Sequence, residues 1–271
     1  MKIGLIGAQN SHSRNFCEAI NKKRPWEDVT ISYIYGGDDP EACKKLCDDF
    51  RITECSSEEE VIEKSDAIVI TYRKGSVHYQ PAIKTIKAGK PLFNDKPFVT
   101  NSCEAKEIVN LAKENGVLLT GGSSLKSLPE LEKIKENIIP GSTVLISFSA
   151  DPESEYDGYW FYGIHAVELC IMLCGLDFVD VRAFKNNNVV ITNVAYPDKL
   201  CVLATTPQSN NLIISISNNG KTICHNVPMN FQDVGPIEFV NMIKNNKSPR
   251  DYDYYVKAVE LTEKIIETGG L

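Results

Sequence analysis

Lys96 and His165 are side chains of types that could move a proton beside a reacting oxygen. A histidine titrates near neutrality and can take a proton from a hydroxyl group, whereas a lysine ammonium stabilises the alkoxide that develops. Such a pair suits the oxidation of a secondary alcohol, in which a cofactor accepts the hydride and the protein supplies position and charge. Taken alone, Lys96 could also be a solvated strand end, and His165 a hydrogen-bonded residue of a helix core.

Lys96 stands where a short apolar run, residues 91–93, ends in the polar residues Asn94 and Asp95. This pattern predicts a buried strand that delivers polar groups to the edge of a sheet, where ligands bind in open α/β folds. Strand patterns at residues 2–7, 29–35, 66–71 and 117–120 alternate with helical ones. The first half is therefore expected to be an α/β Rossmann domain with a doubly wound parallel sheet.

The first strand ends in a glycine turn that resembles a dinucleotide-binding fingerprint. Of the three glycines in G-x-G-x-x-G only Gly7 is present, and Gln9 and His12 occupy the other two places. Asn10 and Ser11 lie in the same turn, and Ser11 could cap the helix or contact phosphate. We expect these five residues to line a nucleotide.

Polar residues at the ends of the later strands complete the predicted cofactor site. Asp38 follows the second strand, where a carboxylate accepts hydrogen bonds from the adenosine ribose and repels a 2′-phosphate. This favours NAD slightly over NADP, although the neighbouring Asp39 before Pro40 also reads as a helix cap. The remaining residues expected near the cofactor are Thr71, Tyr72, His78, Asp95 and Lys96.

After residue 121 the pattern changes from alternating elements to consecutive strands. Alternation or apolar runs at residues 143–150, 179–185, 188–196, 199–205, 212–217 and 221–226 predict strands joined by tight turns. Helices are expected at residues 128–137, 164–174, 236–245 and 252–268. We predict a dinucleotide-binding domain over 1–121 and a substrate and oligomerisation domain over 122–271, an α+β domain with an open, mostly antiparallel sheet. The final helix could pack back on the first domain.

An aromatic stretch precedes the helix that carries His165. Tyr159, Trp160 and Tyr162 have flat faces and polar tips that suit sugars, so they are predicted, with Lys96 and His165, to contact substrate. They could instead hold the two domains together.

The composition, with 42% apolar residues, 24% charged residues and a net charge of −7, argues against nucleic acid or an anionic membrane as partner. The nine cysteines form an odd number without C-x-x-C spacing, which suggests reduced thiols in a cytoplasmic protein. Cys43 and Cys47, like Cys170 and Cys174, have a spacing that could offer two metal ligands. Without a matching second pair we favour small buried residues and expect no metal site.

Several motifs together resemble the glucose-fructose oxidoreductase, inositol dehydrogenase and MocA family (Gfo/Idh/MocA). They are the strand and glycine at 3–7, the run from His78 through 88–91, the Asn-Asp-Lys-Pro quartet at 94–97, and the Tyr-Gly-Ile-His segment at 162–165 followed by Glu168. The resemblance implies a Rossmann domain holding NAD or NADP, a small-molecule substrate such as a sugar or polyol, and a homo-oligomer formed through the second sheet. It implies catalytic roles for Lys96 and His165.

Three features depart from that family. Phe161 stands where an aspartate usually precedes the histidine, two fingerprint glycines are missing, and the chain is short. A nucleotide- or sugar-binding protein that has lost catalysis therefore stays open as an alternative. So does a Rossmann enzyme of other chemistry, such as imine reduction or NAD-assisted elimination.

Overall fold

The computed structural model describes residues 1–207 and 211–271. The chain forms two compact units. The first contains Met1–Val99, Cys103–Ser124 and Phe231–Asp253. The second contains Thr100–Ser102, Leu125–Asn230 and Tyr254–Leu271.

The first unit is built on a six-stranded sheet in which every neighbouring pair is parallel. The strands are β1 (Lys2–Ile6), β2 (Thr30–Tyr35), β3 (Thr53–Glu54), β4 (Ala67–Ile70), β5 (Leu92–Asp95) and β6 (Leu119–Gly122). They lie in the order β3-β2-β1-β4-β5-β6, which is the doubly wound arrangement with its switch point between β1 and β4. The carboxyl ends of these two strands therefore mark the expected ligand crevice.

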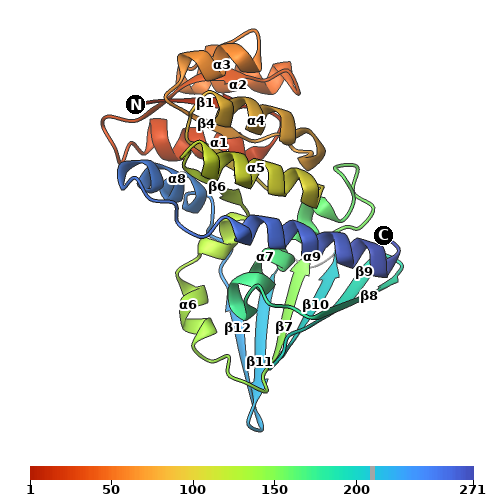
Figure 1. Cartoon of the computed structure of the whole chain (residues 1–271). Helices are drawn as coiled ribbons and strands as arrows, with labels where there is room; N and C mark the ends of the chain where they lie inside the picture. Colours follow the sequence, from red (N-terminus) through yellow and green to blue (C-terminus); the bar gives the residue numbers. More distant parts are fainter. Residues whose placement is uncertain (208–210) are drawn as a thin grey trace. The chain divides into compact units, whose positions relative to one another are not determined.

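Helices cover both faces of this sheet (Figure 1). They are α1 (Ser11–Cys17), the π-helix η1 (Glu18–Lys22), α2 (Pro40–Phe50), α3 (Glu58–Lys64), the 3-10 helix η2 (Gly75–Val77), α4 (Tyr79–Lys87), α5 (Ser102–Glu114) and α8 (Val234–Lys244). On one face, Phe93 of β5 packs edge-on against Phe16 of α1 and Phe239 of α8. The segment with α8 thus completes the core of the first unit, although it follows the second sheet in sequence.

Local chemistry explains where α2 begins and ends. The Asp39 carboxylate accepts a hydrogen bond from Ala42 N at 2.9 Å, and Pro40 occupies the first helical position, where a missing N–H costs nothing. Arg51 ends the helix in the left-handed region at φ 56°. The chain then enters β3, a two-residue strand that is too short to give a sequence pattern.

The second unit contains another six-stranded sheet, in the order β12-β11-β7-β10-β9-β8. Its strands are β7 (Thr143–Ser149), β8 (Asp180–Asn186), β9 (Val189–Ala195), β10 (Leu200–Thr206), β11 (Leu212–Asn218) and β12 (Lys221–Val227). Only β7 and β10 pair in parallel; the other neighbours are antiparallel. The predicted fold class, a parallel Rossmann sheet followed by an open and mostly antiparallel one, is confirmed.

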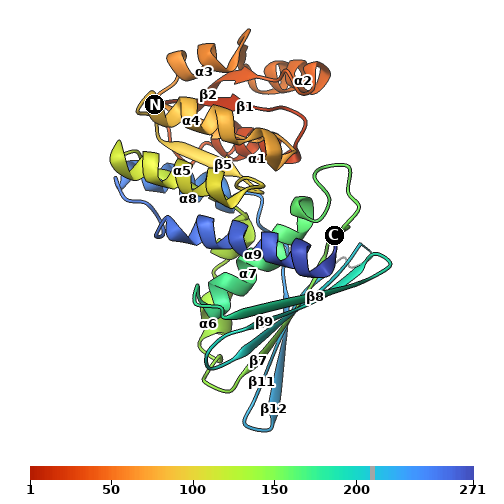
Figure 2. The same ribbon diagram turned by 45° about the vertical axis from the view of Figure 1, so that its right-hand side comes forward.

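The second unit also contains helices. They are α6 (Glu130–Lys135), α7 (Trp160–Cys174) and α9 (Asp253–Gly269), with the 3-10 helix η3 (Ser124–Ser127) before them. Figures 1 and 2 show α7 beside the strands, where it contacts β7 and β10. None of the helices in the described part of the chain has the length and apolar character to cross a membrane.

Two helix predictions are corrected by the structure. The predicted helix at residues 128–137 is shorter, Glu130–Lys135, because Pro129 stands at its amino cap. The helix predicted at residues 164–174 begins earlier in the structure. Helix α7 starts at Trp160, so Phe161 and Tyr162 belong to its first turn and His165 lies in the second.

Candidate active site

Gly7 forms the close contact between the two strands that flank the switch point. Its φ is +101°, and a Cβ atom at this position would lie 2.7 Å from the backbone N of Tyr72. Thr71, which is fully buried at the end of β4, donates from its Oγ1 to the carbonyl oxygen of Gly7 at 3.0 Å. The turn after β1 can therefore approach β4 only with glycine here, as a dinucleotide site requires.

Asp38 holds the backbone of this turn. Its carboxylate accepts hydrogen bonds from Ala8 N at 2.8 Å and from Gln9 N at 3.1 Å. A carboxylate has about four acceptor positions, so the two bonds leave acceptor capacity for ligand hydroxyls. The structure thus brings Asp38, Gln9 and Gly7 together, as the sequence suggested.

His12 and Asn10 converge on the carboxylate of Asp95 at the end of β5. His12 Nδ1 lies 2.7 Å from Asp95 Oδ2, and Asn10 Nδ2 donates to the same oxygen at 3.2 Å. Asn10 also caps α1, since its Oδ1 accepts from His12 N, while Ser11 is the exposed first residue of the helix. Burial acts to raise the pKa of Asp95, but the neighbouring His12 and Lys96 outweigh it and the pKa is lowered. Asp95 is therefore held as a buried carboxylate.

Lys96 follows that carboxylate directly and is only 2% exposed. Burial lowers the pKa of its ammonium, the charge of Asp95 opposes this and that of Arg73 adds to it, and the resulting pKa is about 8. A buried amine that titrates so near neutrality is typical of functional sites. Arg73, in the loop after β4, was not among the predicted site residues, because an arginine beside another cation gives no sequence signal.

Two other predicted cofactor residues, Tyr72 and His78, are engaged within the loop after β4. The His78 ring is fully buried, with Nε2 2.9 Å from the carbonyl oxygen of Tyr72, and burial lowers its pKa. The Tyr72 hydroxyl donates to Glu58 at 2.9 Å. Both side chains fix the shape of the loop that carries Arg73.

In the second unit, His165 lies among aromatic rings. Its ring centroid is 5.5 Å from that of Phe148 and 5.5 Å from that of Tyr162, and the residue is 2% exposed. Tyr162 is 42% exposed, whereas Trp160 is buried. Tyr159 is also buried and accepts a hydrogen bond from Thr205, and burial raises its pKa to about 12. The four predicted substrate residues of this unit thus differ widely in exposure.

A buried ion pair lies one helical turn after His165. Lys126 Nζ is 3.3 Å from Glu168 Oε2, and each side chain is 1% exposed. The ammonium also lies 5.9 Å from the ring centroids of Tyr254 and Tyr255 in α9. Sequence reasoning noted Glu168 only as part of a motif and missed Lys126, since no local pattern links a lysine after β6 to α7.

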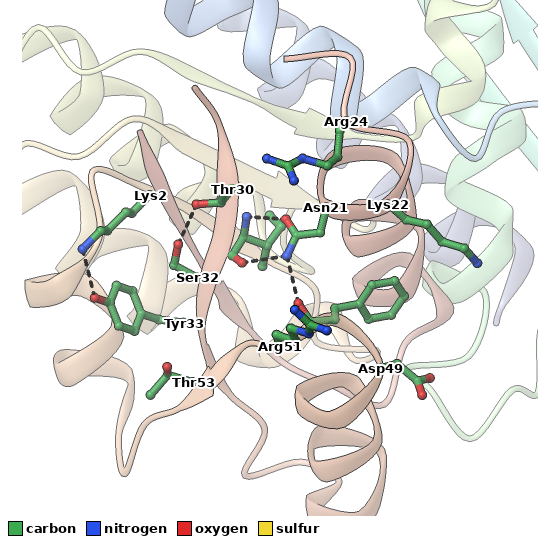
Figure 3. Close-up of a pocket in the computed structure, with 12 residues that line it drawn as sticks. Lys2, Asn21, Lys22, Arg24, Thr30, Ser32, Tyr33, Asp49, Arg51 and Thr53 are labelled. Atoms are coloured by element: carbon green, nitrogen blue, oxygen red, sulfur yellow. Dashed lines mark hydrogen bonds between the residues drawn. The ribbon is translucent and has the colours of Figure 1, made fainter. Parts of the chain in front are cut away.

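A cavity of about 680 Å³ in the first unit lies away from these residues (Figure 3). It lies at the amino ends of β1 and β2, where Asn21 bonds to both backbone groups of Ile31. Its lining includes Lys2, Lys22, Arg24 and Arg51. Because ligands of doubly wound sheets bind at the carboxyl ends, this cavity is not the predicted cofactor site.

A glycine turn, a carboxylate placed to bind a ribose and a buried lysine lie at the carboxyl ends of β1, β2, β4 and β5. This arrangement is typical of a nucleotide-binding Rossmann unit. Residues 1–123 match the family model described as "Oxidoreductase family, NAD-binding Rossmann fold" (GFO_IDH_MocA). The resemblance to the Gfo/Idh/MocA oxidoreductases that was inferred from sequence is thus confirmed over this part of the chain.

Curated relatives match part of the chain. An inositol 2-dehydrogenase of Cereibacter sphaeroides is 31% identical over 117 residues, 43% of this chain and 34% of that protein. The scyllo-inositol 2-dehydrogenase (NADP(+)) of Bacillus subtilis is 30% identical over 79 residues, 29% of this chain and 24% of that protein. The matched segments thus span about a third or less of these relatives' own length.

The fold similarity extends to the whole chain. The crystal structure of GenD2 from gentamicin A biosynthesis, in complex with NAD, has a TM-score of 0.84 at 14% identity. The match covers 100% of this chain and 94% of that one. Both units therefore have counterparts in a solved structure.

Proposed function

We propose that the protein is an NAD-dependent dehydrogenase that transfers a hydride between the nicotinamide and a hydroxyl or carbonyl group of a sugar or polyol. The observation that carries the proposal is Lys96: a buried ammonium with a pKa near 8, beside a buried carboxylate, at the carboxyl end of β5. Burial of a charged amine destabilises the fold. Such a group is therefore typical of sites where its chemistry is used. The family of residues 1–123 and the named inositol dehydrogenases support the same class of reaction.

The residues at the strand ends fit a dinucleotide. Gly7 lets the backbone approach closely, Asn10 and Ser11 lie at the start of α1, and Asp38 offers its remaining acceptor positions to the ribose hydroxyls. A carboxylate fixed by two backbone amides would repel a 2′-phosphate, which favours NAD over NADP. The bound nicotinamide would accept or supply the hydride.

Lys96 and His165 divide the proton chemistry in this proposal. His165 takes the proton from the substrate hydroxyl, and the Lys96 ammonium stabilises the alkoxide that forms. The two residues belong to different units of the chain, and their separate surroundings support the assignment: a carboxylate beside Lys96 and aromatic rings around His165. Tyr162, with its exposed hydroxyl-bearing ring, is proposed to face the substrate, and Tyr159 and Trp160 to support it from within.

Cofactor binding and turnover can be tested on the full chain. Calorimetry with NADH and NADPH should show binding, and a panel of inositols, polyols and sugars should include a substrate that reduces NAD. Lys96→Ala and His165→Asn should then lose turnover by at least about a hundredfold. Lys87→Ala, on the exposed end of α4, and His225→Asn, on β12, serve as matched controls and should keep it.

The alternatives give different results in the same experiment. Binding of NADH without hydride transfer to any member of the panel would indicate a binding protein. With an imine in the panel, turnover of it that survives His165→Asn would indicate imine reduction, which needs no base for a hydroxyl. Absence of binding at millimolar concentration would contradict the proposal at its first step.

We also propose that the chain forms homo-oligomers through the second sheet. The face of this sheet opposite α7 carries exposed apolar side chains on four strands, namely Leu145, Phe184, Val189, Ile191 and Ile213, each at least 37% exposed. Exposed apolar side chains gathered on one face of a sheet are typical of a protein interface. A second copy of this chain is the partner that the resemblance favours.

A further inference from the structure

Cys43, Cys47 and Glu54 form a compact group of donor atoms at the outer edge of the first sheet. The two sulfur atoms and a carboxylate oxygen all lie within 4.8 Å of one another. Cys43 and Cys47 are one turn apart on α2, and Glu54 is on β3, which pairs with β2. The sequence alone showed only the cysteine pair; folding supplies the third donor.

These distances are close to those of a zinc site. With Zn–S bonds of about 2.3 Å and tetrahedral angles, neighbouring sulfur ligands stand about 3.8 Å apart. The donor atoms therefore need to move inward by about 1 Å or less, which side-chain rotation on a helix and an edge strand can supply. Cys43 is buried, Cys47 half-buried and Glu54 exposed, so the group opens to solvent on one side, where water could complete the coordination.

The chemistry of the donors selects the cation. Two thiolates and a carboxylate suit Zn²⁺, whereas Mg²⁺ and Ca²⁺ prefer oxygen ligands alone.

We propose that Cys43, Cys47 and Glu54 bind a zinc ion that joins α2 to β3. Binding replaces the thiol protons of Cys43 and Cys47 by metal bonds and releases those protons to solvent. The site lies outside the proposed catalytic machinery and does not depend on the proposed dehydrogenase activity. It is nevertheless close to the loop of Asp38, because a Cβ atom on Gly36 would lie 2.4 Å from the Cβ of Cys43.

Co²⁺ is a spectroscopic probe for such a site. We expect the reduced, metal-free full chain to bind about one equivalent of Co²⁺ with a thiolate-to-cobalt charge-transfer band in the near ultraviolet, and Zn²⁺ to displace it. Cys43→Ser and Cys47→Ser should each weaken the band strongly, and the double variant should abolish it. Glu54→Gln, at an exposed position where the fold tolerates change, should weaken Zn²⁺ binding by about tenfold or more.

Cys55→Ser is the matched control. Cys55 is buried and follows Glu54 directly, but it lies after the end of β3 and is not one of the three clustered donors, so its loss should leave the band unchanged. A wild-type chain without the band would overturn the proposal. So would a band that persists in the folded double variant, since other thiols of the chain would then hold the metal.

Discussion

His12 Nδ1 and Asp95 Oδ2 lie 2.7 Å apart although the two residues are 83 positions apart in the sequence. This contact ties the turn after β1 to the end of β5, the two places where the sequence suggested cofactor and catalytic residues. The same carboxylate stands next to Lys96 and opposes the effect of burial on its pKa. Asp95 therefore links the shape of the turn to the protonation of the proposed catalytic lysine.

Charge changes around Lys96 should move its titration in opposite directions. Removing the carboxylate in Asp95→Asn takes away the influence that raises the lysine pKa, so the pKa should fall below about 8. Removing the cation in Arg73→Gln should raise it. If the protonated lysine is the active form, the alkaline limb of kcat/KM against pH should shift down in the first variant and up in the second.

Measuring cofactor affinity provides the control for these two variants. Because Asp95 also contacts His12 and Asn10, NADH binding should be measured for each variant, and the pH profile compared at saturating cofactor. Shifts in the same direction for both variants would contradict the electrostatic account.

Lys96 should also cost the protein stability. Its folded pKa of about 8 is below the ordinary 10.5, so below pH 8 both folded and unfolded chains hold the proton and the penalty is constant. Between about pH 8 and 10.5 the unfolded chain binds more protons, so the free energy of unfolding should rise with pH. Lys96→Met should add about 3 kcal/mol at pH 7 and lose that rise, while turnover disappears. Urea unfolding at several pH values, with Lys87→Met as control, measures both effects.

The architecture of both units could be predicted because periodicity survives in the sequence. The buried strand β4 is a continuous apolar run, which is typical of a parallel sheet covered on both faces. In β7 buried and more exposed residues alternate, which is typical of a sheet with one solvated face. The two-residue strand β3 and the start of α7 were not predictable in this way. Aromatic residues at Trp160 and Phe161 resemble a loop when read locally, and only packing against β7 and β10 makes them helical.

Residues of the candidate site could be proposed from sequence where a side chain's own chemistry and a local motif indicate a role. Contacts between charged residues that are far apart in the chain could not. Lys96 and His165 were chosen from their side-chain chemistry and their motifs. Arg73, which alters the pKa of Lys96, and Lys126, which pairs with Glu168, have partners far along the chain. A single sequence contains no information on such pairs, because the distance between the charges is set by the fold.

Asp38 should control the choice of cofactor. In Asp38→Ala the ribose acceptor is lost and the amides of Ala8 and Gln9 lose their partner, so the KM for NAD should rise by about 10- to 100-fold. The effect on NADP should be smaller, because the repulsion of its 2′-phosphate is lost as well. Asp39→Ala is the matched control: it removes the cap of α2 and about 1 kcal/mol of stability but should keep the NAD to NADP ratio. An unchanged ratio in Asp38→Ala would contradict the assigned role.

The buried pair of Lys126 and Glu168 should be needed for folding of the second unit. Glu168→Gln leaves a buried ammonium without its carboxylate, which typically costs about 3–5 kcal/mol. Replacing both residues by apolar ones, Lys126→Met with Glu168→Leu, should restore much of the lost stability. Chemical unfolding followed by circular dichroism distinguishes the single from the double variant. A single variant within about 1 kcal/mol of the wild type would show that the pair is not structurally important.

The proposed oligomer can be tested by introducing charged residues on the apolar face of the second sheet. Leu145 on β7 and Ile191 on β9 are each 37% exposed and lie on the same face. Leu145→Lys with Ile191→Lys should place unpaired ammonium groups in the proposed interface and reduce the mass in solution to the 30.2 kDa of one chain. Val77→Lys, which alters a 48% exposed apolar side chain of the first unit, should leave the mass unchanged. Light scattering after size-exclusion chromatography measures this directly, and a monomeric wild type at micromolar concentration would contradict the proposal, because the exposed face would then be stable without a second copy.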